Sequence, residues 1–521
     1  MTKQEKAQEK AQDEAQEGGE SESQAAASDD LSPHVISGSL WVLLGFGANA
    51  IVNLLRTILL ARALPIEAYG AAAAVLVVSR ILGALGTLGL QAAAIQQKEE
   101  PTRSLMDTVW TIDRLLLKLA SALALYVFAP EIAAYFGDAS LETPVRLLAL
   151  FPAAMALENN AMIALSRKLD IRRRVQLDLS SAFGGALILP AIFLYPDITV
   201  VVVSLIVGRT LRAITSYLIY PVIPRVHISK EAFKQAFPFG RWVFLQNLLL
   251  MSREQIDKII LASILGVSGL GLFELGQRLG AQLISIADQL ALKVLFPVFA
   301  RSQEDRRIGG RRYLITLSVL AALVIPTAAF LAIGADRLTL LLFGEGWEGA
   351  IRAAQILAVA AAIRVIGGAS HPLIRGFGRS DLELGMNVAL VAAIVIAITL
   401  IAPRHGVEGA AYAVLLAYLI QLPVSLLTTK LYLGVSVAAV LRALSPATLS
   451  AALAALLGVG LSLHLPPAGA LPLLLLALVF GGAYLALYLG FARLLDGERF
   501  EVIVSAIQRA RRRQSAAEER G

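Results

Sequence analysis

The sequence contains no cysteine and little charge. Among its 521 residues, Asp, Glu, Lys and Arg together make up 16%, while 57% are hydrophobic. The absence of cysteine excludes disulfides, thiolate metal sites and a cysteine nucleophile. An ordinary soluble domain is about 25% charged and about 45–50% apolar. These proportions exclude a soluble enzyme, a disordered protein and a disulfide scaffold, and they indicate a membrane protein.

The motifs of common catalytic centres are also missing. The chain has neither a Gly-Lys-Ser/Thr loop for ATP nor a Gly-x-Ser-x-Gly nucleophile elbow. Its five histidines lack the spacing of metal ligands. We therefore expect no cofactor, no metal and no enzymatic activity.

Long apolar stretches make up most of the chain. A helix needs about 20 apolar residues to cross a hydrocarbon core of about 30 Å, so fourteen helices take roughly 280 residues. Fourteen stretches lie at about 38–61, 68–95, 106–136, 145–166, 175–195, 198–221, 239–265, 268–298, 313–334, 348–374, 384–402, 407–431, 444–464 and 470–494. We predict an all-α integral membrane protein with about fourteen transmembrane helices.

Charge is unevenly distributed outside these stretches. Residues 1–30 contain nine carboxylates against three lysines, and we expect this acidic, polar tail to be disordered. Lysine and arginine gather in alternate loops, around 98–103, 167–174, 225–234, 301–312 and 375–379. The positive-inside rule places these loops and both chain ends in the cytoplasm. The rule also explains the net charge of +7 without a nucleic-acid partner.

A faint internal repeat divides the chain. The segment 64–70 reads LPIEAYG and is followed by SRILG at 79–83; about 200 residues later 265–271 reads LGVSGLG, followed by QRLG at 277–280. Six helices with loops fill such a period, and transporters that rock one half against the other contain such repeats. The predicted parts are an acidic tail (1–35), an N lobe of six helices (36–224), an amphipathic linker (225–238), a C lobe of six helices (239–435), two further helices (436–495) and a basic tail (496–521).

Charged side chains inside the apolar stretches carry the main functional signal. A charge at the bilayer centre costs about 2.5–3.5 kcal/mol on insertion scales, so these groups should face a cavity or one another. The cations outnumber the acids, and the candidates for binding substrate are Arg80, Lys118, Arg209, Arg212, Lys258, Arg278 and Arg364. The pattern predicts a cationic cavity between the lobes that takes an anionic cargo.

Ion pairing between helices is the alternative for some of these residues. Lys258 adjoins Asp257, and Arg278 lies four residues after Glu274, whereas Lys118 could extend to the membrane interface. Cavity lining is favoured for the cations without an acid within one turn, which are Arg80, Arg209 and Arg364. The candidate ion-coupling acids, for which helix pairing is again an alternative, are Glu158, Asp257 and Asp288.

Several motifs, taken in order, resemble those of one family. The matching segments are ARALPIEAYG at 61–70, DKIIL at 257–261, LFPVFA at 295–300, LFGEGWEGA at 342–350 and GFGRSD at 376–381. Over about residues 36–435 the chain resembles the Wzx-like bacterial polysaccharide flippases of the multidrug/oligosaccharidyl-lipid/polysaccharide exporter superfamily. Pro65 stands where that family often has glycine.

The resemblance implies two six-helix lobes in a V-shaped arrangement, two additional C-terminal helices and alternating access in the bacterial inner membrane. It also implies an undecaprenyl-pyrophosphate-linked oligosaccharide as cargo, a repeat unit of exopolysaccharide, capsule or O-antigen. Other polysaccharide assembly proteins are candidate partners.

Two other functions stay open. One is a lipid II flippase or cation-coupled drug antiporter of the same superfamily, although a basic lumen suits cationic drugs poorly. The other is a membrane-embedded glycosyltransferase or polymerase, which short outer loops disfavour.

Overall fold

The computed structural model describes residues 41, 44–45, 47–290, 306–371, 374, 380–466 and 469–518, with side chains described except at 282–290, 306–308, 380 and 496–518. Described residues of the N-terminal part form a first helix over 47–63, then α2 (Ile66–Leu85), α3 (Leu90–Gln96), α4 (Arg103–Val109), the π-helical η1 (Trp110–Leu116), α5 (Leu117–Val127), α6 (Ala129–Tyr135), α7 (Glu142–Leu148), α8 (Leu150–Ala156), α9 (Ala161–Arg167), α10 (Ile171–Ile188) and α11 (Ile198–Ile219). We refer to these helices as the N lobe.

The remaining helices follow in sequence. They are α12 (Lys230–Leu290), α14 (Arg306–Ile333), α15 (Ala335–Leu342), the 3-10 helix η5 (Glu345–Ala350), α16 (Ile351–Gly368), α18 (Ser380–Leu433), α19 (Val437–Ser462) and α20 (Ala470–Glu518). We refer to α12 through α18 as the C lobe. The all-α membrane architecture predicted from composition is therefore confirmed.

Nine helices in the described part of the chain are long and apolar enough to cross a membrane, or eleven when each of two bent pairs counts as one span. The bent pairs are Arg103–Val127 with Ala129–Tyr135, at 63°, and Ala139–Ala156 with Ala161–Arg167, at 49°. The predicted total of fourteen is not established by these numbers and stays a prediction.

Two of the nine helices are long enough for two crossings each. Lys230–Ala281 has 52 residues and Asp381–Leu433 has 53, against the about 20 that one crossing needs. Each contains one residue with non-helical dihedrals, Gly266 at φ 69° and Gly406 at φ 60°. Only glycine adopts such a φ without a steric penalty. The breaks predicted near 266 and 405 from the apolar stretches are therefore confirmed.

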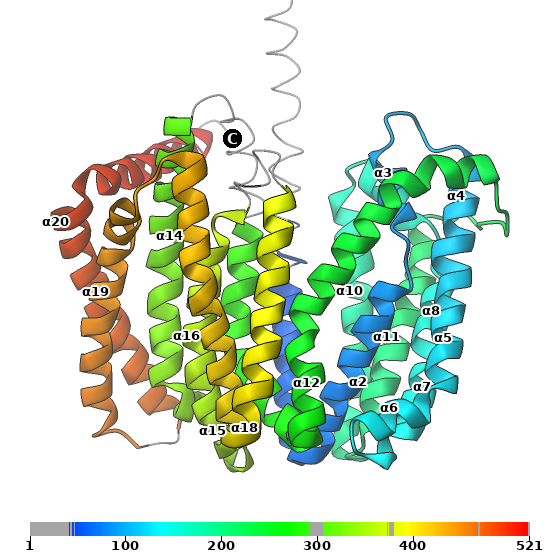
Figure 1. The fold of residues 1–521 in the computed structure, drawn as a ribbon, viewed down its shortest axis with the longest axis horizontal. Coiled ribbons are helices and arrows are strands. Elements are labelled where there is room, and N and C mark those ends of the chain that lie inside the picture. Colours follow the sequence, from blue (N-terminus) through cyan, green and yellow to red (C-terminus); the bar gives the residue numbers. More distant parts are fainter. Residues whose placement is uncertain are drawn as a thin grey trace, which may run out of the picture.

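Figure 1 shows the N lobe beside the C lobe, with α19 and α20 on the far side of the C lobe. The ribbons converge toward the end where α6 and α15 lie and separate toward the end where α3 and α4 lie. Helix α12 runs between the lobes and packs on α2, α16 and α18. Because α12 contacts helices of both lobes, its side chains are placed at their interface.

The lobes share one hydrophobic cluster at the converging end. It joins buried residues of the N lobe, such as Leu60 and Val75, to Leu270 of α12 and to Trp347 of η5. Gly70 of α2 and Gly271 of α12 bring two backbones close together there, because a β-carbon on either glycine would lie within 3.1 Å of backbone atoms of the other segment. The two segments that the sequence relates as repeats therefore pack directly against each other.

Residues 230–238 of the predicted amphipathic linker form the beginning of α12. Ser229 precedes the helix, and its hydroxyl oxygen accepts a hydrogen bond from the backbone N–H of Ala232. Phe233 and Phe237 stack with ring centroids 5.0 Å apart. Ala232 and Ala236 are buried in a cluster with residues of α3 and α4. This segment thus rests on the N lobe and continues without a break into the membrane span.

Candidate functional site

A cavity of about 380 Å³ is lined mainly by the C lobe, and Arg80 is its lining residue from the N lobe. It is lined by residues of α2, α12, α16 and α18. Five cationic side chains take part, namely Arg80, Arg253, Lys258, Arg278 and Arg364, together with three carboxylates, Glu254, Asp257 and Glu274. With all eight groups ionised, the wall carries a net charge of +2. Four of the sequence-predicted cations and one predicted acid, Asp257, therefore line the same cavity.

Glu274 joins two of these cations. Its carboxylate lies 2.8 Å from Lys258 Nζ and 2.7 Å from an Arg278 guanidinium nitrogen. Lys258 and Glu274 are buried, whereas the side chain of Arg278 is 29% exposed. The pairing of Arg278 with Glu274 was one alternative that the sequence left open, and it is present. One acid between two cations leaves this cluster with a net positive charge.

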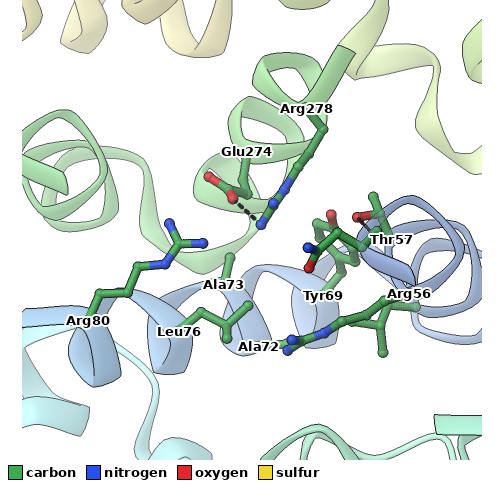
Figure 2. A pocket seen from close by; sticks show the side chains of 11 residues that line it. Arg56, Thr57, Tyr69, Ala72, Ala73, Leu76, Arg80, Glu274 and Arg278 are labelled. Atoms are coloured by element: carbon green, nitrogen blue, oxygen red, sulfur yellow. Dashed lines mark hydrogen bonds and ion pairs between the residues drawn. The ribbon is translucent and has the colours of Figure 1, made fainter. Parts of the chain in front are cut away.

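A smaller cavity of about 50 Å³ adjoins this cluster. Figure 2 shows Arg56 and Arg80 on one side of it and Arg278 with Glu274 on the other. Arg56 Nη2 and Arg278 Nε are buried without a hydrogen-bond partner in this structure. Buried N–H groups that lack an acceptor are costly, and an anion in the cavity would satisfy these two nitrogens.

Arg56 is a cavity residue that the sequence reading missed. It lies within the apolar stretch at 38–61 and therefore gave the same signal as Arg80. Its place beside Arg80 follows from the contact of the first helix with α2 across the small cavity. A complete inventory of cations inside apolar stretches would have included it.

The converging end of the lobes is held by polar contacts as well as by glycine packing. The Arg62 guanidinium donates to the backbone carbonyls of Leu341 and Leu342, at 2.6 and 2.9 Å. The Trp347 indole N–H donates to the Ala61 carbonyl at 2.8 Å, and the ring packs edge-on against Tyr69. These contacts tie the end of the first helix to the segment before α16. The lobes are thus closed at this end, beyond which the cavities begin.

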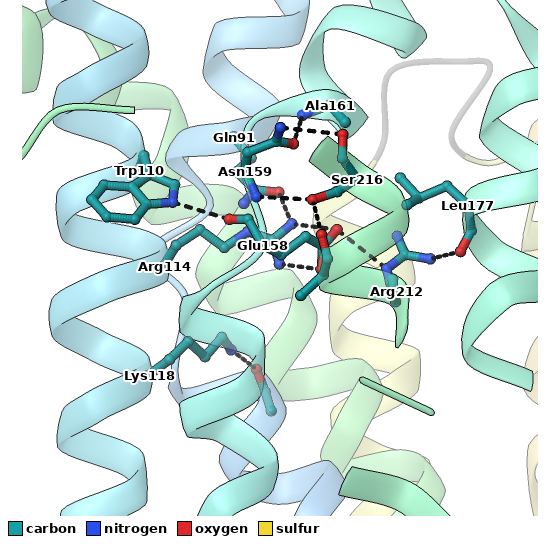
Figure 3. Close-up of polar contacts among 12 residues, drawn as sticks. Gln91, Trp110, Arg114, Lys118, Glu158, Asn159, Ala161, Leu177, Arg212 and Ser216 are labelled. Carbon is teal, nitrogen blue, oxygen red and sulfur yellow. Dashed lines mark hydrogen bonds and ion pairs between the residues drawn. The ribbon is translucent and has the colours of Figure 1, made fainter. Parts of the chain in front are cut away.

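A second charged cluster lies inside the N lobe. Glu158, at the break between α8 and α9, lies 3.0 Å from an Arg114 nitrogen and 3.2 Å from an Arg212 nitrogen. Arg212 also pairs with Asp178 at 2.7 Å. The indole of Trp110 donates to the Glu158 carbonyl. Figure 3 shows these groups converging on the helix break. Two arginines around one buried carboxylate stabilise its ionised form and hold three helices together.

Lys118 satisfies the backbone of a broken helix. Its ammonium donates to the Gly83 carbonyl, near the end of α2, at 3.0 Å. The chain then turns through 86–89 before α3 begins, and the Asp113 carboxylate accepts from the backbone N–H groups of Leu88 and Leu90 at 2.9 Å. Backbone groups freed at membrane depth need such partners. Lys118 and Asp113 supply these hydrogen-bond partners.

The remaining predicted residues are dispersed. Arg209 packs over the Phe151 ring, with its guanidinium carbon 5.2 Å from the centroid. The lining of the larger cavity contains none of Lys118, Arg209, Arg212 and Glu158. The side chain of Asp288 lies outside the described part of the chain. The substrate-binding and ion-coupling roles of all these residues stay predictions.

Comparison with known proteins places the chain in a family. The family model described as polysaccharide biosynthesis protein matches residues 59–352, more than half of the sequence. The chain belongs to the polysaccharide biosynthesis protein family. The matched residues include most of the N lobe, α12 and the segment around Trp347 that closes the converging end. The resemblance seen in the sequence is therefore confirmed.

Two similar proteins with known names agree with this assignment. The chain is similar to the teichuronic acid biosynthesis protein TuaB of Bacillus subtilis, at 23% identity over 57% of this chain and 61% of the relative. It is similar to the lipopolysaccharide biosynthesis protein WzxC of Escherichia coli, at 21% identity over 75% of this chain and 80% of the relative. The match spans less than two thirds of TuaB's own length.

The fold has a solved counterpart. The structure of the lipid II flippase MurJ in an inward closed conformation matches with a TM-score of 0.71, covering 88% of this chain and 99% of that one. The sequence identity is 14%, so the match shows a shared fold. The likeness agrees with the predicted all-α fold of transmembrane helices.

Proposed function

We propose that this member of the polysaccharide biosynthesis protein family is a flippase of the bacterial inner membrane. It moves an undecaprenyl-pyrophosphate-linked oligosaccharide, a repeat unit of a surface polysaccharide, from the inner to the outer leaflet. The observation that carries the proposal is the gathering of Arg80 of the N lobe with Lys258, Arg278 and Arg364 of the C lobe around one cavity. The family membership and the names of its relatives support the same function.

The charge of the cavity suits this cargo. A pyrophosphate diester carries about two negative charges, since each esterified phosphate carries one. The cavity wall carries +2 when its five cations and three carboxylates are ionised. Arginine binds phosphate oxygens through two parallel N–H groups, which an ammonium group cannot do. Arg80, Arg278 and Arg364 would therefore hold the pyrophosphate, while the polyprenyl tail stays in lipid.

Access alternates between the two membrane faces. The positive-inside rule puts the loops around 98–103 and 167–174 in the cytoplasm, so the converging end faces outward. The structure would then correspond to a state that loads from the inside. Breaking the Arg62 and Trp347 contacts and the Gly70–Gly271 contact would open the outer end, while the opposite ends of the lobes approach each other.

An ion gradient or the membrane potential would drive the cycle, because the sequence contains no ATP-binding motif. Asp257 is the coupling candidate that lines the cavity, whereas Glu158 is held between two arginines. The protein would act without forming or breaking covalent bonds. Other polysaccharide assembly proteins would supply its cargo and take up its product.

The test uses purified full-length protein in liposomes with a fluorescent lipid-linked oligosaccharide. A membrane-impermeant quencher added outside measures how much label reaches the outer leaflet. Protein-dependent exposure of the label is expected, with the glycan intact. Exposure equal to that of empty liposomes would contradict the proposal, and elongation or cleavage of the glycan would instead indicate an enzyme.

A further inference from the structure

The larger cavity has an uncharged polar wall beside its cationic one. Gln255 and Gln277 of α12 and Tyr418 of α18 line it together with the charged groups. These residues are neutral at any physiological pH and add nothing to the binding of phosphate charge. Side-chain amides and hydroxyls in a binding site fix the orientation of neutral polar ligands. These three residues therefore suit a neutral polar part of a ligand, beside the part that the cations bind.

The side chain of Gln255 has an unsatisfied hydrogen-bond acceptor. The residue is 1% exposed, and its Oε1 is buried without a hydrogen-bond partner. An amide buried in this way costs free energy unless a ligand or water hydrogen-bonds to it. Since Gln255 lines the cavity, a molecule bound there can supply the partner.

Gln277 is held in one orientation. Its Nε2 donates to Asp257 Oδ2 at 3.2 Å, while the other oxygen of Asp257 accepts from the backbone N–H of Lys258 at 2.9 Å. An amide whose nitrogen is already anchored offers its oxygen as an acceptor of fixed direction. Asp257 therefore makes Gln277 a rigid hydrogen-bonding group on the cavity wall.

Tyr418 of α18 also lines the cavity. It is 7% exposed and packs in the C-lobe core beside Val414. A tyrosine in such a place offers a flat apolar ring and one hydroxyl. The small residues Ala360 and Ala361 of α16 line the same cavity. A ring-shaped ligand with hydroxyl groups on its rim and apolar C–H faces fits this combination.

We propose that Gln255, Gln277 and Tyr418 form a subsite for the first sugar of the cargo, adjoining the cations that take the pyrophosphate. This inference rests on the proposed function. The ligand class is a sugar ring with free hydroxyls, because the three residues offer hydrogen bonds and an apolar ring but no charge. The subsite makes the protein distinguish a glycosylated lipid carrier from the bare one.

The experiment compares two probes on purified full-length protein in detergent. One is a short-chain polyprenyl pyrophosphate, and the other is the same lipid bearing one neutral hexose. The wild-type protein should bind the glycosylated probe more tightly. Gln255→Leu should weaken binding of the glycosylated probe by about five- to tenfold, as expected for one or two lost hydrogen bonds, and leave the bare probe unchanged.

Further variants separate a local effect from a loss of folding. Tyr418→Phe removes only a hydroxyl and should weaken binding of the glycosylated probe alone. Arg80→Gln should weaken binding of both probes. Gln235→Leu is the matched control, because Gln235 is exposed at the start of the same helix, and it should change neither affinity.

The outcomes distinguish the two proposals. If Gln255→Leu and Tyr418→Phe change the affinities for both probes equally, or change neither, the sugar subsite is wrong while the flippase proposal stands. If the wild-type protein binds neither probe, the proposed function fails.

Discussion

Gly70 and Gly271 lie backbone against backbone across the two lobes, in reciprocal contacts. A β-carbon on Gly70 would overlap the carbonyl oxygen of Val267, and one on Gly271 would lie 2.9 Å from the carbonyl oxygen of Ile66. Each glycine thus meets the residue four positions before its counterpart. The two repeats therefore approach each other in the same way from both sides, at the end where the lobes are closed.

Gly70→Ala should open the converging end. The added methyl group cannot fit against backbone atoms, so the lobes must separate there or α2 must shift. The chain has no cysteine, so Leu64→Cys introduces a single thiol at a residue that is 4% exposed. Labelling of that thiol by a maleimide should become about fivefold faster in the presence of Gly70→Ala, equivalent to a shift of about 1 kcal/mol. Gly83→Ala, in the same helix with open space around it, should leave the rate unchanged.

Arg80→Gln and Arg364→Gln should each lower flipping without lowering membrane abundance. Each removes a cation from the cavity wall, and a hydrogen bond to a charged group contributes about 1.5–3 kcal/mol. We expect the affinity for a polyprenyl pyrophosphate to fall by about 10- to 100-fold. The matched control is Arg404→Gln, at an exposed arginine away from the cavity. Unchanged affinity in both cavity variants would contradict the assignment of the cationic wall to the cargo.

Glu158→Gln should destabilise the N lobe. The change leaves Arg114 and Arg212 buried with no common counter-charge, which in soluble proteins costs about 3–5 kcal/mol. The expected result is a lower Tm of the purified protein and lower abundance in membranes. Glu142→Gln breaks an exposed pair with Arg146 and should change stability by less than about 1 kcal/mol. A Glu158→Gln protein of normal Tm whose transport no longer responds to pH would instead support a coupling role.

Lys258 and Glu274 should be energetically coupled. Glu274→Gln leaves Lys258 and Arg278 without their shared acid, and Lys258→Met leaves Glu274 with Arg278 alone. Both single variants should lower Tm. The double variant should lower it by less than the sum, because it removes the unpaired charge of Lys258 that Glu274→Gln leaves and keeps only Arg278 without its acid. A double-mutant cycle of Tm values, measured in one detergent, tests this coupling, and strict additivity would count against it.

The amino-acid sequence by itself determined the class of the protein. Its apolar stretches are a local property of composition, and the breaks at Gly266 and Gly406 fall between them because glycine accepts a positive φ. The repeat of the segments around Gly70 and Gly271 could also be seen in the sequence, because it is a local pattern of residues. The order of the motifs was sufficient to predict the family, and the match to the family model confirms that prediction.

The tertiary structure decided which charges belong together. In sequence, Arg80 and Arg212 are equivalent, since each is a cation inside an apolar stretch. Arg80 lines a cavity together with cations of the C lobe, whereas Arg212 meets Glu158 and Asp178 inside the N lobe. Likewise Lys118 meets a carbonyl freed by the end of α2. Partners of this kind come from helices distant in sequence, so helix packing alone brings them within the few ångströms over which charges pair.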